Sequence, residues 1–219
     1  MMSTALSTHP HGNQPLYHWG KPATEASTAM ILLHGRGATA ESILSLAPAF
    51  ERPNLAYVAP QAAGDSWYPY RFVEPVARNE PYLSSALQRI DEVVADLNDK
   101  GIAAAQIILG GFSQGACLAA EYTARHAQRW GGLLVFSGGL IGPPGAEFNF
   151  GGSLKGTPVF IGCSDTDFHI PLMRVHETTR VLTDLGAKVT ERIYPDMGHT
   201  IIEDEIEQAQ AIIDQLDHY

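Results

Sequence analysis

Residues 107–116 constrain the fold of this chain more than any other segment, because they join an apolar run to a helix-compatible run through a fixed turn motif. Ile107, Ile108 and Leu109 have the branched apolar side chains of a buried strand, and small residues favourable to a helix follow position 115. Between them stands Gly-x-Ser-x-Gly, with Ser113 at its centre. A serine at the tip of a sharp turn has a strained backbone, and side chains two positions away would collide there, so both positions favour glycine. The context predicts a nucleophilic serine raised above a sheet, with a chance turn in a glycine-rich chain as the alternative.

Apolar runs and helical periodicities alternate along the rest of the sequence. Strands are expected at residues 28–33, 55–59, 107–109, 132–136, 158–161 and 188–194, the last alternating like a strand near a sheet edge. Helices are expected after Ser113 and at residues 39–50, 79–100, 171–185 and 203–218. This alternation predicts one α/β domain over residues 28–219, with a mostly parallel central sheet flanked by helices on both faces. Residues 1–27 are expected to form an N-terminal tail with a short edge strand at 16–19.

Four side chains carry local expectations. Asn79 is expected to cap the helix that follows it, with Pro81 in the first turn of that helix. Cys117 and Cys163 are expected to be small core residues, as free cysteines usually are. A thiol nucleophile is the less favoured interpretation, because neither cysteine has the flanking glycines of Ser113.

Composition and charge limit the partners of the chain. It has 219 residues, with 14 basic and 24 acidic side chains and a formal net charge of -10, which disfavours nucleic acid and anionic membrane surfaces. No apolar run approaches the ~20 residues of a membrane span, and the first 20 residues lack the pattern of a secretory signal. We therefore expect a cytoplasmic protein without stable membrane insertion. His9, His11 and His18 have no cysteine or acidic neighbours, so a mobile, solvated tail over the first dozen residues is favoured over a metal site.

A nucleophilic serine needs a base, and the base needs an orienting group. In this architecture the order along the chain is serine, acid, histidine, each in a loop after a strand. His199 lies between the strand expected at 188–194 and the last helix, so it is the predicted base, with a capping or solvated loop histidine as the alternative. Two acids, Asp165 and Asp167, follow the strand at 158–161. The spacing to Pro171 favours Asp167, and Asp165 would then cap or brace the loop.

Two backbone N–H groups are predicted to stabilise an oxyanion. One belongs to Gln114, the residue after the serine. The other is assigned to Arg36, because His34-Gly35-Arg36-Gly37 is glycine-rich and lets the backbone approach a substrate oxygen closely. A tight turn into a helix is the simpler interpretation of that loop. The Arg36 side chain attracting an acidic group of a substrate is a further alternative.

Five segments carry a family resemblance: 32–37 (LLHGRG), 109–116 (LGGFSQGA), 136–138 (FSG), 162–171 (GCSDTDFHIP) and 197–199 (MGH). In order and spacing they resemble the phospholipase/carboxylesterase family of α/β-hydrolases, which includes small bacterial carboxylesterases, lysophospholipases and acyl-protein thioesterases. The resemblance implies a single-domain α/β-hydrolase fold with little or no lid, and a serine hydrolase without cofactor or metal. It also implies a triad of Ser113, Asp167 and His199, with the oxyanion held by the N–H groups of Arg36 and Gln114.

The chain departs from this family at two places. Members that act on acylated proteins or lysophospholipids commonly have a hydrophobic residue at the position of Arg36. This difference weakens the case for a substrate with a long apolar acyl chain. The loop that contains Trp67 replaces a differently built Trp-containing loop of those relatives. Trp67 is predicted to line the substrate pocket, with structural packing as the alternative.

These observations lead to one functional expectation with alternatives. The chain is expected to be a serine carboxylesterase that hydrolyses small to medium carboxylic esters through an acyl-enzyme, with a small-molecule ester as its partner. Hydrolysis of lysophospholipids or acyl-protein thioesters needs a longer apolar channel and is the alternative. Dienelactone-type hydrolysis is a further enzymatic alternative, although its nucleophile is commonly a cysteine. The alternative of another class is a binding protein that has the same fold and no catalytic activity. The sequence is silent on oligomeric state, and a homodimer is one option because this lidless fold often pairs through surfaces near the site.

Overall fold

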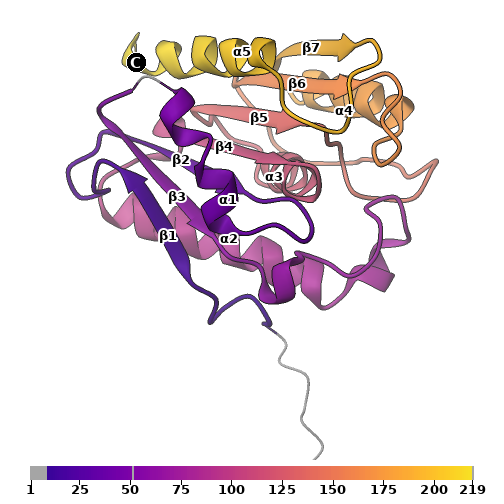
Figure 1. The fold of residues 1–219 in the computed structure, drawn as a ribbon, viewed down its shortest axis with the longest axis horizontal. Coiled ribbons are helices and arrows are strands. Elements are labelled where there is room, and N and C mark those ends of the chain that lie inside the picture. The colour runs from indigo at the N-terminus through magenta and orange to yellow at the C-terminus, as the bar shows by residue number, and fades with distance from the viewer. Residues whose placement is uncertain (1–8, 51, 219) are drawn as a thin grey trace, which may run out of the picture.

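The computed structural model describes residues 9–50 and 52–218, and its centre is a seven-stranded sheet with the order β1-β3-β2-β4-β5-β6-β7 (Figure 1). β1 runs antiparallel to β3, and all other neighbouring strands are parallel. The strands are β1 (Leu16–Gly20), β2 (Thr28–Leu33), β3 (Leu55–Pro60), β4 (Ile107–Phe112), β5 (Gly132–Phe136), β6 (Pro158–Ser164) and β7 (Lys188–Tyr194). The α-helices are α1 (Ala40–Leu44), α2 (Tyr82–Asp99), α3 (Gln114–Arg125), α4 (Leu172–Asp184) and α5 (Glu203–Ile213). The expected mostly parallel α/β architecture is confirmed.

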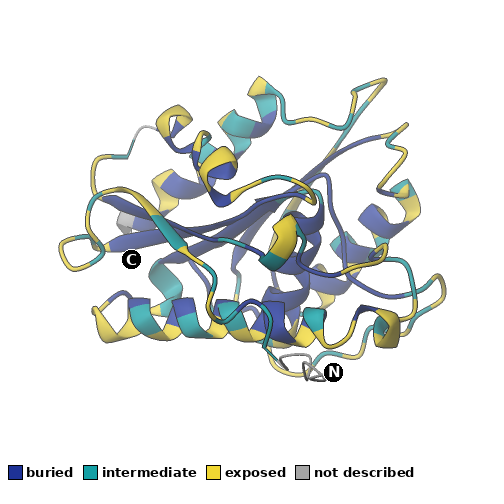
Figure 2. Cartoon of the chain, turned by 60° about the horizontal axis from the view of Figure 1, so that its bottom comes forward, coloured by how far each residue is buried: buried dark blue, intermediate teal, exposed yellow. Residues whose placement is uncertain are grey.

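Helices cover both faces of this sheet. Successive side chains of a strand point to opposite faces, so β2 divides its apolar residues between two cores. Ala29, Ile31 and Leu33 pack with residues of α2, α3 and α4, whereas Met30 and Leu32 pack with residues of α1 and α5. In Figure 2 the central strands are buried along their length, while each helix exposes its outer side. Burial on both faces explains why the inner strands read as continuous apolar runs.

The order of the strands places β4 in the middle of the sheet, between β2 and β5. β7 lies at one edge and alternates exposed and partly buried residues, which confirms its expected edge position. The short strand β1 forms the other edge. Because β2 to β7 run in the same direction, the loops after their carboxyl ends gather along one side of the sheet. The candidate site lies there.

The helix expected at residues 39–50 is interrupted. α1 begins after Thr39, whose Oγ1 accepts a hydrogen bond from the Ser42 N–H, and it ends at Leu44. Ala47–Ala49 then form a separate 3₁₀ turn. Pro48 has no N–H to donate, and its ring clashes with the turn before it, so a regular helix cannot continue through this position.

The prediction that Asn79 caps the following helix was wrong. α2 begins at Tyr82, after a cis peptide bond between Glu80 and Pro81. The buried Asn79 side chain instead fixes the preceding loop: its Oδ1 accepts from the Tyr70 N–H at 2.9 Å and its Nδ2 donates to the Arg71 carbonyl at 3.3 Å.

The prediction of a solvated N-terminal tail was also wrong for the part of the tail that the structure describes. His11 has no exposed surface, and its Nε2 donates to the Trp67 carbonyl while its Nδ1 accepts from the Ala63 N–H, both at 3.0 Å. The ring of His9 is hydrogen-bonded to two side chains of α2. Its Nδ1 lies 2.8 Å from the Ser85 Oγ, and its Nε2 lies 2.9 Å from Oε1 of Glu92. The rest of the predicted mobile segment, residues 1–8, lies outside the described residues. The segment from His9 to β1 is therefore hydrogen-bonded both to α2 and to the loop at 61–79, and links the two.

Within residues 9–50 and 52–218, no helix is both long and apolar enough to cross a membrane.

Candidate active site

Ser113 stands at the turn between the central strand β4 and helix α3. Its backbone has φ 55° and ψ −117°, a conformation that residues with a side chain rarely adopt. The glycines on either side permit this turn. A Cβ on Gly115 would lie 2.0 Å from the Leu33 carbonyl oxygen, and one on Gly111 would lie 2.6 Å from the same atom. The close packing of the turn against the end of β2 therefore requires both glycines of the motif.

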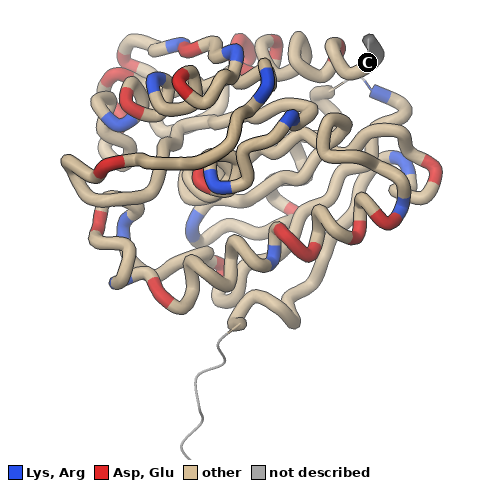
Figure 3. The backbone as a smooth tube through the Cα atoms, turned by 180° about the vertical axis from the view of Figure 1, so that it is seen from behind, with Lys and Arg blue, Asp and Glu red and all other residues tan. Residues whose placement is uncertain are grey.

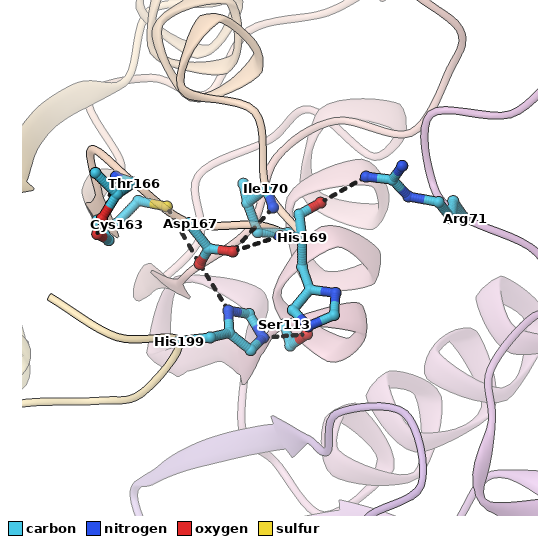
Figure 4. A network of polar contacts seen from close by, with 9 residues as sticks. Arg71, Ser113, Cys163, Thr166, Asp167, His169, Ile170 and His199 are labelled. Carbon is cyan, nitrogen blue, oxygen red and sulfur yellow. Dashed lines mark hydrogen bonds and ion pairs between the residues drawn. The ribbon is translucent and has the colours of Figure 1, made fainter. Parts of the chain in front are cut away.

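The structure brings Ser113 together with His199 and Asp167, which come from the loops after β7 and β6 (Figure 4). The Ser113 Oγ lies 2.8 Å from Nε2 of His199, and Nδ1 of the same ring lies 2.6 Å from Oδ2 of Asp167. A carboxylate can only accept, so Nδ1 donates and Nε2 is free to accept the serine proton. The three groups thus form one continuous hydrogen-bonded chain.

The environment of Asp167 favours the ionised form of its carboxyl. Burial of its side chain alone would raise the pKa of the carboxyl, but the hydrogen bond from His199 and those from the N–H groups of His169 and Ile170 outweigh burial and lower the pKa below 3.8. Asp165, the other candidate acid, is exposed and accepts from the Asp196 N–H at 2.9 Å. It braces the loop that leads to His199 and does not touch the imidazole.

Two rings hold the His199 imidazole in place. The Phe112 ring lies 4.7 Å from it and the His169 ring 4.8 Å, both tilted. The loop of His199 is anchored further back by Glu205 of α5, whose Oε2 accepts from the Ile202 N–H at 3.0 Å. Burial raises the pKa of Glu205 to about 7. A Cβ on Gly162 would lie 2.1 Å from Oε1 of this glutamate, so the glycine in β6 makes room for it.

The loop after β2 and the start of α3 border the space in front of Ser113. Arg36 and Gln114, whose N–H groups are the predicted oxyanion donors, both line this space. Within the described residues, neither N–H has a hydrogen-bond acceptor from the protein. The buried His34 fixes the loop: its Nδ1 donates to the Gly35 carbonyl at 2.8 Å and its Nε2 accepts from the Ala62 N–H at 3.1 Å.

Trp67 does not line the pocket as predicted. The side chain has no exposed surface, and its Nε1 donates to the His34 carbonyl at 2.9 Å. Packing beneath the loop, the alternative interpretation, is what the structure contains. The pocket wall is formed instead by Tyr68, Arg71 and Phe72 from the same loop. Only the aromatic character of this loop pointed to them in the sequence.

The two cysteines are buried, as expected. Burial raises the pKa of both thiols to about 12, so neither is poised as a thiolate nucleophile at neutral pH. Cys117 lies one helical turn after Ser113 and is one of the residues that line the pocket. Cys163 lies near the candidate triad acid, with its Sγ 3.9 Å from Oδ2 of Asp167.

A sequence model described as phospholipase/carboxylesterase matches residues 20–216. The chain belongs to the phospholipase/carboxylesterase family. Its fold resembles the crystal structure of a phospholipase/carboxylesterase from Dyadobacter fermentans, with a TM-score of 0.88 and 45% identity over 92% of this chain and 96% of that one. It is 27% identical to a probable carboxylesterase of Oryza sativa over 86% of this chain and 88% of the relative. It is 30% identical to acyl-protein thioesterase 1 of Kluyveromyces lactis over 68% of this chain and 74% of the relative.

As a phospholipase/carboxylesterase family member the chain is a hydrolase that acts on ester bonds, with the single-domain α/β-hydrolase fold. The site of this family member opens into a pocket of about 280 Å³ that contains Ser113, His199 and the Arg36 loop. That volume is just below the range of about 300–1,000 Å³ of pockets that bury drug-sized ligands.

Proposed function

We propose that this hydrolase cleaves small to medium carboxylic esters through an acyl-enzyme on Ser113. The observation that carries the proposal is the unbroken chain of hydrogen bonds from Asp167 through His199 to the Ser113 hydroxyl, at the mouth of a pocket. Serine is a weak nucleophile unless a neighbouring base takes its proton, and this arrangement supplies an oriented base.

The proposed reaction has two halves. The Ser113 Oγ attacks the carbonyl carbon while its proton passes to Nε2 of His199, and the N–H groups of Arg36 and Gln114 hold the resulting oxyanion. The intermediate collapses, the imidazolium gives its proton to the leaving alcohol, and an ester of Ser113 remains. Water then attacks this ester with His199 as base, and the carboxylic acid leaves. Asp167 keeps the imidazole in the required tautomer throughout.

Hydrolysis of long-chain substrates, such as acyl-protein thioesters or lysophospholipids, is the second candidate. Phe168 and Met173 are 94% and 81% exposed and flank, in the sequence, the part of the pocket wall that contains His169 and Ile170. Large apolar side chains in water provide a surface that a long acyl chain would cover. The modest pocket volume favours the first candidate.

The test is hydrolysis of 4-nitrophenyl esters from acetate to palmitate by the wild type and by Ser113→Ala. We expect wild-type turnover to peak at short or medium chains, and Ser113→Ala to lose up to about a millionfold in kcat. Ser137→Ala is the matched control, because it removes a buried hydroxyl from the loop after the neighbouring strand β5, outside the hydrogen-bonded chain. It should retain wild-type turnover.

Other outcomes decide between the candidates. A maximum at palmitate would favour the long-chain candidate. Equal inactivity of the wild type and Ser113→Ala over the whole panel would contradict ester hydrolysis at this site, and would favour a binding protein that has kept the fold.

A further inference from the structure

The pocket in front of Ser113 is lined by basic side chains and by no acidic one, as far as the described residues extend. Arg36, Arg71, His169 and His199 contribute to its wall, whereas none of its lining residues is aspartate or glutamate. This composition is unexpected in a chain with a formal net charge of -10. Figure 3 shows acidic and basic residues interspersed over helices and loops, so the one-sided lining is a property of the pocket.

Arg36 is already committed to the protein. Its Nη1 donates to the Ser66 Oγ at 3.0 Å and to the Pro69 carbonyl at 2.8 Å, and its Nη2 donates to the Tyr70 carbonyl at 2.6 Å. These bonds use the guanidinium to fix the loop at 61–79. Arg36 therefore contributes positive charge to the pocket, but its guanidinium N–H groups are already used in hydrogen bonds within the protein.

Arg71 is the guanidinium that remains available. Its side chain is exposed at the pocket wall, and its Nη2 donates to the His169 carbonyl at 3.3 Å (Figure 4). This is a long bond to a neutral acceptor, and within residues 9–50 and 52–218 no carboxylate lies within ion-pair distance of Arg71. A guanidinium has five N–H donors in a planar fork that matches a carboxylate. The contact with His169 uses only a small part of that capacity.

The surroundings of Arg71 also favour a negative charge. Ser113 lies at the N-terminus of α3, a helix of 12 residues, where the helix dipole is positive. The carboxylate of Asp167, close to Ser113 through His199, has a side chain without exposed surface and is hydrogen-bonded to His199. Its charge therefore acts on the imidazole and is not presented to the pocket.

We propose that the substrate carries a carboxylate in addition to the ester that is cleaved, and that Arg71 binds this carboxylate. The inference rests on the proposed function and narrows its substrate class to esters of carboxylated acids or alcohols. The planar fork of one guanidinium matches the two oxygens of a carboxylate in a bidentate pair. Arg71 is then a specificity-determining residue of the reaction.

Matched pairs of esters test this proposal and separate the two halves of the substrate. For the acyl half, 4-nitrophenyl hydrogen adipate is compared with 4-nitrophenyl methyl adipate, which differs only in the capped carboxylate. For the alcohol half, 4-carboxyphenyl butyrate is compared with 4-carbamoylphenyl butyrate. The quantity measured in each pair is the ratio of kcat/KM for the charged ester to kcat/KM for the neutral one.

We expect this ratio to exceed one in the wild type for one of the two pairs. Arg71→Gln should lower that ratio by about tenfold to a hundredfold, since a hydrogen bond between charged groups is lost. Arg71→Lys should retain part of it, because lysine keeps the charge and loses the fork. Raising the salt concentration should lower the ratio of the wild type and leave that of Arg71→Gln nearly constant. Arg180→Gln, at an exposed position of α4, is the control and should keep the wild-type ratio.

Binding of adipate to Ser113→Ala, measured by calorimetry, gives a second readout that does not depend on turnover. The double variant Ser113→Ala/Arg71→Gln should bind adipate at least tenfold more weakly. Equal ratios in the wild type and Arg71→Gln for both pairs, together with equal adipate binding, would overturn the proposal while ester hydrolysis stands. Absence of turnover on the charged and the neutral esters alike would overturn the proposed function instead, and unchanged adipate binding in the double variant would then overturn the role of Arg71 as well.

Discussion

The side chain of Gln114, the residue after the candidate nucleophile, is hydrogen-bonded to the backbone on both sides of the peptide that joins Trp67 and Tyr68. Its Oε1 accepts from the Trp67 N–H at 2.9 Å, and its Nε2 donates to the Tyr68 carbonyl at 2.8 Å. The first residue of α3 thus fixes the loop that walls the pocket. Ser113 and that loop cannot shift independently of each other.

Gln114→Ala should destabilise the protein and impair its activity. The substitution leaves the buried N–H of Trp67 without a partner, which costs about 1–3 kcal/mol in the free energy of unfolding. The Tyr68 carbonyl loses one of two donors and keeps the Ser66 hydroxyl at 2.9 Å. The backbone N–H of residue 114 remains, so residual activity should be well above that of Ser113→Ala. Urea denaturation and kcat/KM on 4-nitrophenyl butyrate measure both effects. Gln215→Ala, at an exposed glutamine, is the control, and equal behaviour of the two variants would contradict this role of Gln114.

Asp167→Asn and Asp165→Asn should separate the two acids of the same loop. The NH₂ group introduced by Asp167→Asn can donate to Nδ1 of His199 and so favours the wrong tautomer, and kcat should fall about 10⁴-fold, as in the serine protease precedent. Asp165→Asn keeps an oxygen that accepts from the Asp196 N–H, so its kcat should stay within about tenfold of the wild type. The reverse ranking in steady-state kinetics would exchange the roles of the two residues.

His11 should contribute stability that is lost in acid. Burial lowers the pKa of its imidazole below 6.5, so the folded chain keeps this ring neutral where the unfolded chain binds a proton. The unfolded state then binds more protons, and stability falls as the pH drops below about 6.5. His11→Ala should be less stable at pH 7.5 by about 2–4 kcal/mol, with a shallower loss between pH 7 and pH 5. The buried His34 shares this behaviour, so some acid sensitivity should remain. His18→Ala, at an exposed histidine, should match the wild type in urea denaturation at each pH.

Glu205 should have the opposite effect on the pH dependence of stability. Its pKa is raised to about 7 from 4.5, so the folded chain keeps the carboxyl protonated where the unfolded chain has ionised it. The folded state then binds more protons, and the free energy of unfolding should fall between about pH 4.5 and pH 7, by up to about 3 kcal/mol. Glu205→Gln imitates the protonated acid and should remove this slope. Glu203→Gln, at an exposed acid of the same helix turn, should keep it. Parallel slopes for both variants would rule out a titrating Glu205.

The features that could be predicted from the sequence are those written in local patterns. The apolar runs of the inner strands need no partner to be recognised, because burial on both faces leaves no polar position in them. Ser113 could be predicted because its turn requires a glycine two positions before it and another two positions after it. A Cβ at either glycine would collide with the end of β2. His199 and Asp167 follow from the order of strands and loops, and the structure brings both to Ser113.

The features that escaped prediction depend on contacts between distant segments. His11 sits among polar, proline-rich residues, and nothing local indicates that its ring lies between Ala63 and Trp67, more than 50 positions along the chain. Asn79 has the sequence context of a helix cap, yet its amide is used by the loop before it. Trp67 resembles a pocket residue by composition alone. Its burial follows from hydrogen bonds with His34 and Gln114, which only the folded chain brings near.

The loop at 61–79 is attached by side chains from four separate places: His11 before β1, Arg36 after β2, Gln114 at the start of α3, and its own Asn79. It contributes no member of the triad, yet Tyr68, Arg71 and Phe72 come from it. One part of the pocket wall is therefore encoded apart from the residues of the candidate triad. Substitutions at positions 68, 71 and 72 can therefore reshape this part of the wall while the side chains that anchor the loop, and the hydrogen-bonded chain at Ser113, stay as they are.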